Sequence, residues 1–158
     1  MKVVLARVDE RLLHGQVIAS WSRILEIKKI LVVDDKIAID PFMKQVLEMT
    51  SPTGVEAKVI TCEEAFNELS SSSNNIKTML LFKGVEAPLK LRKLGFALTE
   101  LDIGNIGSGP TRKPITRRVF MSDDEVNIVK ELQKLNVFVY LQMLSADPKI
   151  DFKDIKGE

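Results

Sequence analysis

The sequence predicts a single α/β domain over residues 1–158, with helices on both faces of a doubly wound, largely parallel β-sheet. Short β-branched runs alternate with longer stretches of helical period, as in a sheet whose strands are joined by crossover helices. The run Ile30–Val33 is apolar at every position, which is typical of a strand covered on both faces. No internal repeat or long linker divides the chain, and its length suffices for one buried core.

The strands are expected where short runs of apolar and β-branched residues are bounded by polar or turn-forming residues. The run at residues 30–33, for example, is closed by Asp34 and Asp35. In chain order, the expected strands are residues 3–8, 30–33, 55–60, 79–82, 98–103 and 137–141.

The helices are expected between these strands, because apolar residues recur there at helical spacing and several starts carry capping residues. Asp40 and Pro41 are a favoured pair of N-cap and first helical residue. Thr61–Glu64 and Ser122–Glu125 both have the spacing of a capping box. The expected helices are residues 16–25, 41 to about 51, 61 to about 70, 85–94 and 122–135. The polar chain after Asp147–Pro148 is expected to be loosely held.

The composition excludes several classes of function. The chain has 23 Lys and Arg against 22 Asp and Glu, so it has no net field that would attract nucleic acid. It has one Cys and one His, which excludes an internal disulfide, a Cys-rich metal site and a His-cluster metal site. There is neither a signal-peptide-like segment nor a run of about 18 apolar residues, so we expect a cytoplasmic protein.

The connection after the first strand is the most informative segment for function. It holds the only histidine, His14, immediately before Gly15 and the predicted helix. A helix N-terminus offers free backbone N–H groups and a partial positive charge to an anion. An imidazole is a competent nucleophile near neutral pH, and the nearby Arg7 and Arg11 could stabilise a phosphoryl group in transfer. Composition alone leaves open that His14 only caps the helix or forms hydrogen bonds within the loop.

A glycine-rich loop at residues 104–114 is the second candidate. In a doubly wound sheet, ligands bind beyond the carboxyl ends of the strands, which favours the loops after the first, second and fifth strands. Glycines let a backbone approach a ligand, and side chains such as Ser108 and Arg112 could donate to a phosphate. A plain flexible surface loop is the alternative interpretation.

The string Arg7–Val17 resembles the active-site motif of the IIB components of the bacterial sugar phosphotransferase system (PTS), mannose/fructose/sorbose class. Every position of that family's motif is matched, and residues 30–35 and 101–107 also resemble the family. The resemblance implies an α/β fold and a phosphohistidine-carrying transferase with no cofactor and no metal. It implies a IIA phosphoryl donor, the membrane components IIC and IID, and a sugar that is phosphorylated as it enters. It also implies that IIC and IID could bring the chain to the inner face of the membrane.

The resemblance assigns roles residue by residue. His14 matches the phosphorylated histidine, which the family uses through Nδ1, and Arg11 matches an arginine that contacts the phosphoryl group. Arg7 and Asp9 match the other polar positions. Asp9 could orient a guanidinium or fix the imidazole tautomer, or it could only cap a turn, while Arg7 could simply lie on the sheet surface. The residues expected to bind the phosphoryl group or a partner are Gly15, Gln16, Gly107, Ser108 and Arg112.

Other interpretations stay open at this stage. A doubly wound sheet could instead bind a nucleotide or a phosphate ligand without a covalent step, or could serve as a regulatory interaction domain. Asp34 and Asp35 could suggest Mg²⁺, although capping or an ion pair is the simpler explanation. Cys62 lies within a capping box and is expected to pack in the core. Neither the identity of the sugar nor the oligomeric state can be predicted.

The basic residues of the two loops suggest a positive face that would attract an acidic IIA partner, with the compensating acids mostly elsewhere in the chain. The alternative is that Arg117 and Arg118 begin a strand and point to opposite faces. The residues of this expected face are Arg7, Arg11, Arg112, Lys113, Arg117 and Arg118.

Overall fold

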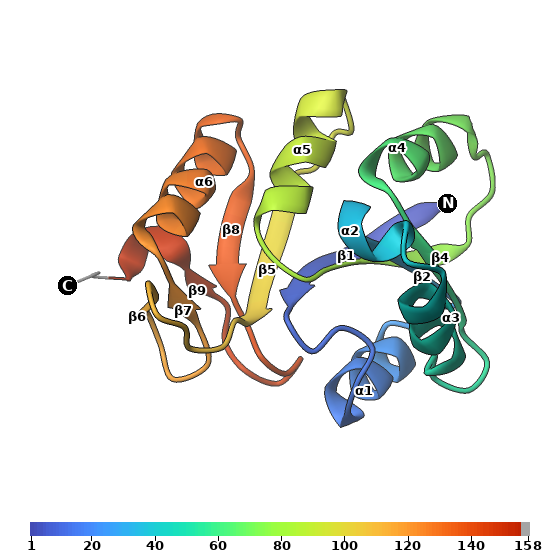
Figure 1. Cartoon of the computed structure of the whole chain (residues 1–158), viewed down its shortest axis with the longest axis horizontal. Helices are drawn as coiled ribbons and strands as arrows, with labels where there is room; N and C mark the ends of the chain where they lie inside the picture. Colours follow the sequence, from blue (N-terminus) through green and yellow to red (C-terminus); the bar gives the residue numbers. More distant parts are fainter. Residues whose placement is uncertain (156–158) are drawn as a thin grey trace.

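A computed structural model describes residues 1–155 of the chain. Its centre is a seven-stranded sheet with the order β3-β2-β4-β1-β5-β8-β9, in which only β9 runs antiparallel to its neighbour (Figure 1). The strands of this sheet are β1 (Lys2–Asp9), β2 (Lys29–Val33), β3 (Glu56–Ile60), β4 (Lys77–Phe82), β5 (Glu100–Asn105), β8 (Phe138–Leu141) and β9 (Ile150–Asp151). The predicted α/β class and largely parallel sheet are therefore confirmed.

Helices cover both faces of this sheet, as predicted. The helices α4, α5 and α6 lie on one face and α1 and α3 on the other (Figure 1). Their apolar residues form two core clusters, one on each side of the sheet. The helices are α1 (Gln16–Ile24), α2 (Asp35–Ala38), α3 (Pro41–Met49), α4 (Cys62–Ser71), α5 (Glu86–Leu94), α6 (Asp123–Lys134) and a final 3-10 turn (Phe152–Asp154).

The helix starts follow the capping signals in the sequence. Asp40 accepts a hydrogen bond from the backbone N–H of Met43 at the start of α3. Both capping boxes are formed, by Thr61 and Glu64 before α4 and by Ser122 and Glu125 before α6. These local contacts fix the residue at which each of the three helices begins.

Two features of the fold differ from the expectations. Residues 149–155 are not loosely held, because β9 pairs with β8 and Phe152 packs into the core at 9% exposure, and the remainder of the polar tail lies outside the described residues. The loop after β5 contains a short hairpin, β6 (Lys113–Pro114) and β7 (Phe120–Met121). Both were missed because two-residue strands leave no periodic pattern to detect.

The strand order defines where the candidate loops lie. The central strand β1 has β4 on one side and β5 on the other, so its carboxyl end is a switch point in the order. The loops after β1 and β5 meet there, since Asp9 pairs in register with Asn105. The loop after β2 is one strand farther away, because β4 separates β2 from β1. Across residues 1–155, no helix has the length and apolar character needed to cross a membrane.

Candidate active site at the carboxyl end of the central strand

The loop from β1 to α1 places His14 in solvent. Leu12 and Leu13 are 4% and 3% exposed and pack into the core beneath α1 and α3. Leu12 adopts a left-handed conformation, with φ of 55°, and its backbone N–H donates to the carbonyl of Asp9. These apolar anchors bend the chain so that the next residue, His14, is exposed at the rim of the sheet. The adjacent leucines of the motif therefore explain why a histidine in this loop faces outward.

The N-terminus of α1 is open beside His14. Its N-cap is Gly15, at φ 89°, which provides no side-chain cap, and the first turn holds no acidic residue. Gly15 and Gln16 are both exposed. The first backbone N–H groups of a helix lack partners within the helix and carry partial positive charge. This end of α1 can therefore receive the oxygens of an anion held next to the imidazole.

Asp9 holds Arg11 in place. Asp9 is 1% exposed, and its Oδ1 accepts hydrogen bonds from the backbone N–H of Arg11 at 3.0 Å and from Arg11 Nε at 3.3 Å. Arg11 Nη2 donates to Asp9 Oδ2 at 3.4 Å, while 40% of the Arg11 side chain remains exposed. The expected orientation of a guanidinium by Asp9 is thus present in the geometry. Among the described residues, no hydrogen bond joins Asp9 to His14. The structure therefore shows no contact through which Asp9 would fix the tautomer of the imidazole.

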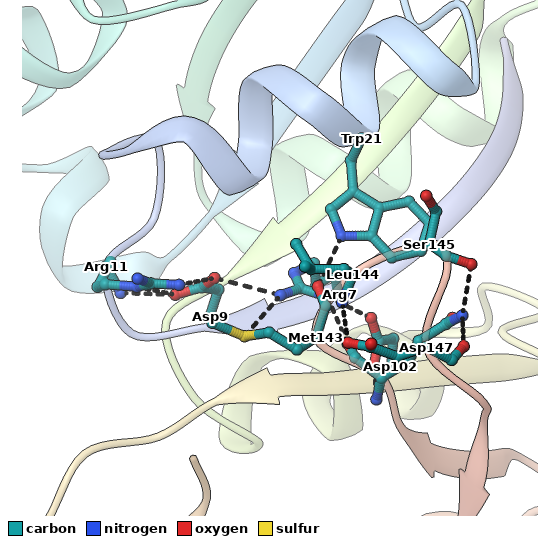
Figure 2. A network of polar contacts seen from close by, with 10 residues as sticks. Arg7, Asp9, Arg11, Trp21, Asp102, Met143, Leu144, Ser145 and Asp147 are labelled. Carbon is teal, nitrogen blue, oxygen red and sulfur yellow. Dashed lines mark hydrogen bonds and ion pairs between the residues drawn. The ribbon is translucent and has the colours of Figure 1, made fainter.

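Arg7 is fully buried, so the suggestion that it lies on the sheet surface is wrong. Its Nη1 donates to Asp102 Oδ2 at 2.5 Å and to the carbonyl oxygen of Gln142 at 2.8 Å, and its Nη2 lies 3.5 Å from Asp9 Oδ2 (Figure 2). The guanidinium also lies 5.6 Å from the centre of the Trp21 ring. Arg7 therefore does not reach a phosphoryl group on the surface, and its contacts support the loop from within.

Asp102 is the buried partner that sequence reasoning missed. Arg7 and Asp102 are register neighbours on adjacent parallel strands, and Asp102 Oδ1 accepts from the backbone N–H of Gln142 at 2.9 Å. Burial raises the pKa of Asp102 to about 7, although Arg7 and that N–H group oppose the rise. The available signal was an aspartate between Leu101 and Ile103 in an apolar strand, because a buried acid needs a partner.

Gly104 makes room for the Arg7 guanidinium. A Cβ atom at Gly104 would lie 2.1 Å from Arg7 Nη2 and 2.2 Å from Arg7 Cζ. The first glycine of the second candidate loop thus admits a buried side chain of the same protein. The sequence pattern suggested a close approach to a ligand at this loop.

Gly104→Ala is expected to destabilise the fold by about 1–3 kcal/mol, because the added methyl group overlaps a guanidinium fixed by two carboxylates. Urea unfolding at neutral pH measures the change. Gly109→Ala is the matched control in the same loop, since its Cβ would lie 3.4 Å from Arg112 Cδ, an ordinary contact. Equal stability of the two variants would show that Arg7 can move aside without cost.

The rest of the second loop is tied to the first by ion pairs and is not a plain flexible loop. The backbone N–H of Gly107 donates to Glu10 Oε2 at 2.7 Å. Arg112 donates to Glu10 Oε1 at 3.0 Å and binds Glu125 through two bonds of 2.9 and 3.1 Å. Burial of Glu10 would raise its pKa, but the Gly107 N–H and Arg112 outweigh that effect and lower it. Ser108 lies exposed on this loop.

The expected positive face needs correction. Arg7 is buried between two aspartates, and Arg112 is neutralised by Glu10 and Glu125 from the same region. The compensating acids therefore lie within the site and not elsewhere in the chain. The exposed basic residues of the expected set are Arg11, Lys113, Arg117 and Arg118.

The aspartates after β2 have structural contacts. Asp34 caps α2, and Asp35 accepts from the backbone N–H of Cys62 and pairs with Lys90, so capping and ion pairing are confirmed. Cys62 is buried, as expected, and burial raises the pKa of its thiol to about 12. Over residues 1–155, no group of three or more His, Cys, Asp or Glu side chains is arranged to hold a metal ion.

The chain matches a known protein family over almost its whole length. The model for the family described as PTS system sorbose subfamily IIB component matches residues 3–158. The chain belongs to this family. This IIB component is 30% identical to the sorbose-specific EIIB component of Lacticaseibacillus casei over 152 residues, which span 96% of the chain and 93% of that protein.

Two further similarities extend this result. The crystal structure of manxB from Thermoanaerobacter tengcongensis is 38% identical with a TM-score of 0.86, and the match covers 96% of this IIB component and 93% of that chain. The mannose-specific EIIAB component of Escherichia coli K12 is 26% identical over 98% of this chain, but the match spans 48% of that longer protein.

The family defines the type of reaction. PTS IIB components of this class are sugar phosphotransferases that accept a phosphoryl group from IIA and pass it to a sugar. The chain is therefore a phosphoryl carrier of a sugar phosphotransferase system. The alternative of a non-covalent nucleotide-binding module is not favoured.

Proposed function

We propose that His14 is the residue that carries the phosphoryl group. The observation that supports this most is the position of His14, the only histidine of the chain. It is exposed beside the uncapped N-terminus of α1, between the buried pair Leu12–Leu13 and Gly15. A nitrogen of the neutral imidazole attacks the phosphorus of the phosphohistidine on IIA. The P–N bond to the donor breaks as the new P–N bond forms, and the donor imidazole keeps the electron pair.

In the second step, a sugar hydroxyl oxygen attacks the phosphorus on His14, and the P–N bond breaks. The imidazole of His14 keeps the electron pair of the broken P–N bond and takes up one proton, which balances the proton that the sugar hydroxyl loses. In both steps negative charge is spread over the phosphoryl oxygens, and Arg11 and the N–H groups at Gly15 and Gln16 stabilise it. Gly107, Ser108 and Arg112 shape the neighbouring loop and form part of the surface that a partner meets.

The partners follow from the same proposal. The EIIAB relative, of which this chain matches about half, supports a IIA domain as the donor. The acceptor is a sugar presented by the membrane components IIC and IID, which would hold the chain at the cytoplasmic face of the membrane.

Radiolabelled phospho-IIA mixed with this chain tests the proposal, since transfer of an acid-labile, alkali-stable label is expected. A chain that stays unlabelled under these conditions contradicts it.

Arg11→Lys is expected to slow phosphoryl transfer by about tenfold or more, because lysine keeps the charge but loses the planar fork that can hold two oxygens. Rapid-quench measurement of label transfer from phospho-IIA gives the rate. Arg23→Lys on the exposed face of α1 is the control and should leave the rate unchanged. Wild-type transfer by Arg11→Lys would reduce Arg11 to a steering charge.

A further inference from the structure

Four charged side chains form one chain of contacts from the core to the site, as Figure 2 shows. Asp102 contacts Arg7, Arg7 contacts Asp9, and Asp9 contacts Arg11. The side chains of Asp102, Arg7 and Asp9 are at most 1% exposed, whereas 40% of the Arg11 side chain is in solvent. The buried end is therefore Asp102, and the end that can touch a phosphoryl group is Arg11.

The buried end also fixes the segment after β8, residues 142–147. Asp102 and Arg7 bind the backbone N–H and carbonyl of Gln142, and the indole N–H of Trp21 donates to the carbonyl of Met143 at 3.1 Å. The side-chain Nε2 of Gln142 donates to the backbone carbonyl of Asp147 at 2.9 Å, which closes the segment into a turn. One carboxylate oxygen of Asp102 is held by Arg7 and the other by the backbone N–H of Gln142. Asp102 therefore cannot shift without moving the backbone at Gln142.

This arrangement is costly for the free energy of folding. Two buried carboxylates share one buried guanidinium, and desolvation of such groups offsets much of their attraction. Within the described residues, the buried Nε of Arg7 has no hydrogen-bond partner. Apolar side chains of similar size would fill the same space without these costs. The charged chain is better explained by the geometry that it gives to Arg11 than by stability.

We propose that Asp102 is a positioning residue for phosphoryl transfer. Through Arg7 it fixes the carboxylate of Asp9, and Asp9 in turn presents the Arg11 guanidinium toward the phosphoryl group on His14. Asp102 itself touches neither the donor nor the sugar. This inference rests on the proposed role of His14, and it adds a residue of β5 to a site that the β1 motif alone had defined.

A double-mutant cycle tests this coupling, with the rate of transfer from saturating phospho-IIA as the readout. Asp102→Asn is expected to slow transfer by about tenfold in the wild-type background and by less than about twofold in an Arg11→Ala background. The KM for phospho-IIA should stay unchanged, because Asp102 acts on the transferring group and not on docking. Arg7→Lys is measured in the same cycle, so that a folding failure of one variant does not decide the result.

A destabilised control separates positioning from stability. Val59→Ala removes a buried side chain of β3, at the edge of the sheet away from the site, and should lower stability but leave the rate unchanged. Equal slowing by Asp102→Asn with and without Arg11, or no slowing at all, would overturn the inference. Wild-type protein that takes no label would instead contradict the role of His14, so the two failures can be told apart.

Discussion

Replacing His14 with alanine or glutamine should abolish phosphoryl acceptance from phospho-IIA and leave the fold intact. The side chain is exposed and makes no hydrogen bond within the described residues, so the unfolding free energy should change by no more than about 1 kcal/mol. Label transfer measures the first effect, and urea unfolding measures the second. No other residue of the chain can replace the imidazole, because His14 is the only histidine.

The exposed Gln16→Ala is a useful control at the same helix end, because its backbone N–H remains. It should still accept the phosphoryl group. If His14→Ala retained the label, the acceptor would lie elsewhere and the central claim would fail. If both variants lost the label, the loop as a whole would matter and the specific role of the imidazole would be unsupported.

Replacing Arg7 with methionine is expected to destabilise the protein by about 3–5 kcal/mol, because Asp9 and Asp102 lose the buried charge that they share. The loss should also depend on pH. Burial already raises the pKa of Asp102 from 3.8 to about 7. In the wild type, the free energy of unfolding therefore falls as pH rises through that range and the buried acid loses its proton. Without Arg7 the pKa of Asp102 rises further, so the free energy of unfolding keeps falling above pH 7. Urea unfolding at pH 6 and pH 8 measures both effects.

The double variant Arg7→Met with Asp102→Leu should recover part of this stability, because one of the two unpaired carboxylates is removed. Arg23→Met, an exposed change on α1, should have little effect. An Arg7→Met protein as stable as the wild type at pH 8 would show that water or a rearranged Arg11 neutralises the buried acids.

The sequence predicted the parts of the site that are local. The motif from Arg7 to Val17 located the loop, the open helix end and the exposed histidine, since these depend on adjacent residues. The capping boxes and the buried strands followed from short patterns in the same way. Their positions in the structure agree with the prediction because little in them depends on distant parts of the chain.

The contacts between distant strands could not be predicted. The pairing of Arg7 with Asp102 requires β5 beside β1, and nothing in the spacing of the strands gives that order. The same limit applies to Arg112. Its sequence position suggested a side chain free to donate hydrogen bonds to a phosphate, but in the structure it pairs with Glu10 and Glu125. Long-range charge pairing therefore decided which basic residues of the two loops remain exposed.

The chemical identity of the phosphorylated residue tests the role of His14 most directly. Phosphorus NMR and peptide mapping of the wild-type chain, after incubation with phospho-IIA, report the atom that carries the phosphoryl group. We predict a single phosphohistidine at His14 that is stable to alkali, is lost in acid and disappears when the sugar and the IIC and IID components are added. A phosphoryl group on Cys62, on a serine or on a carboxylate would contradict it.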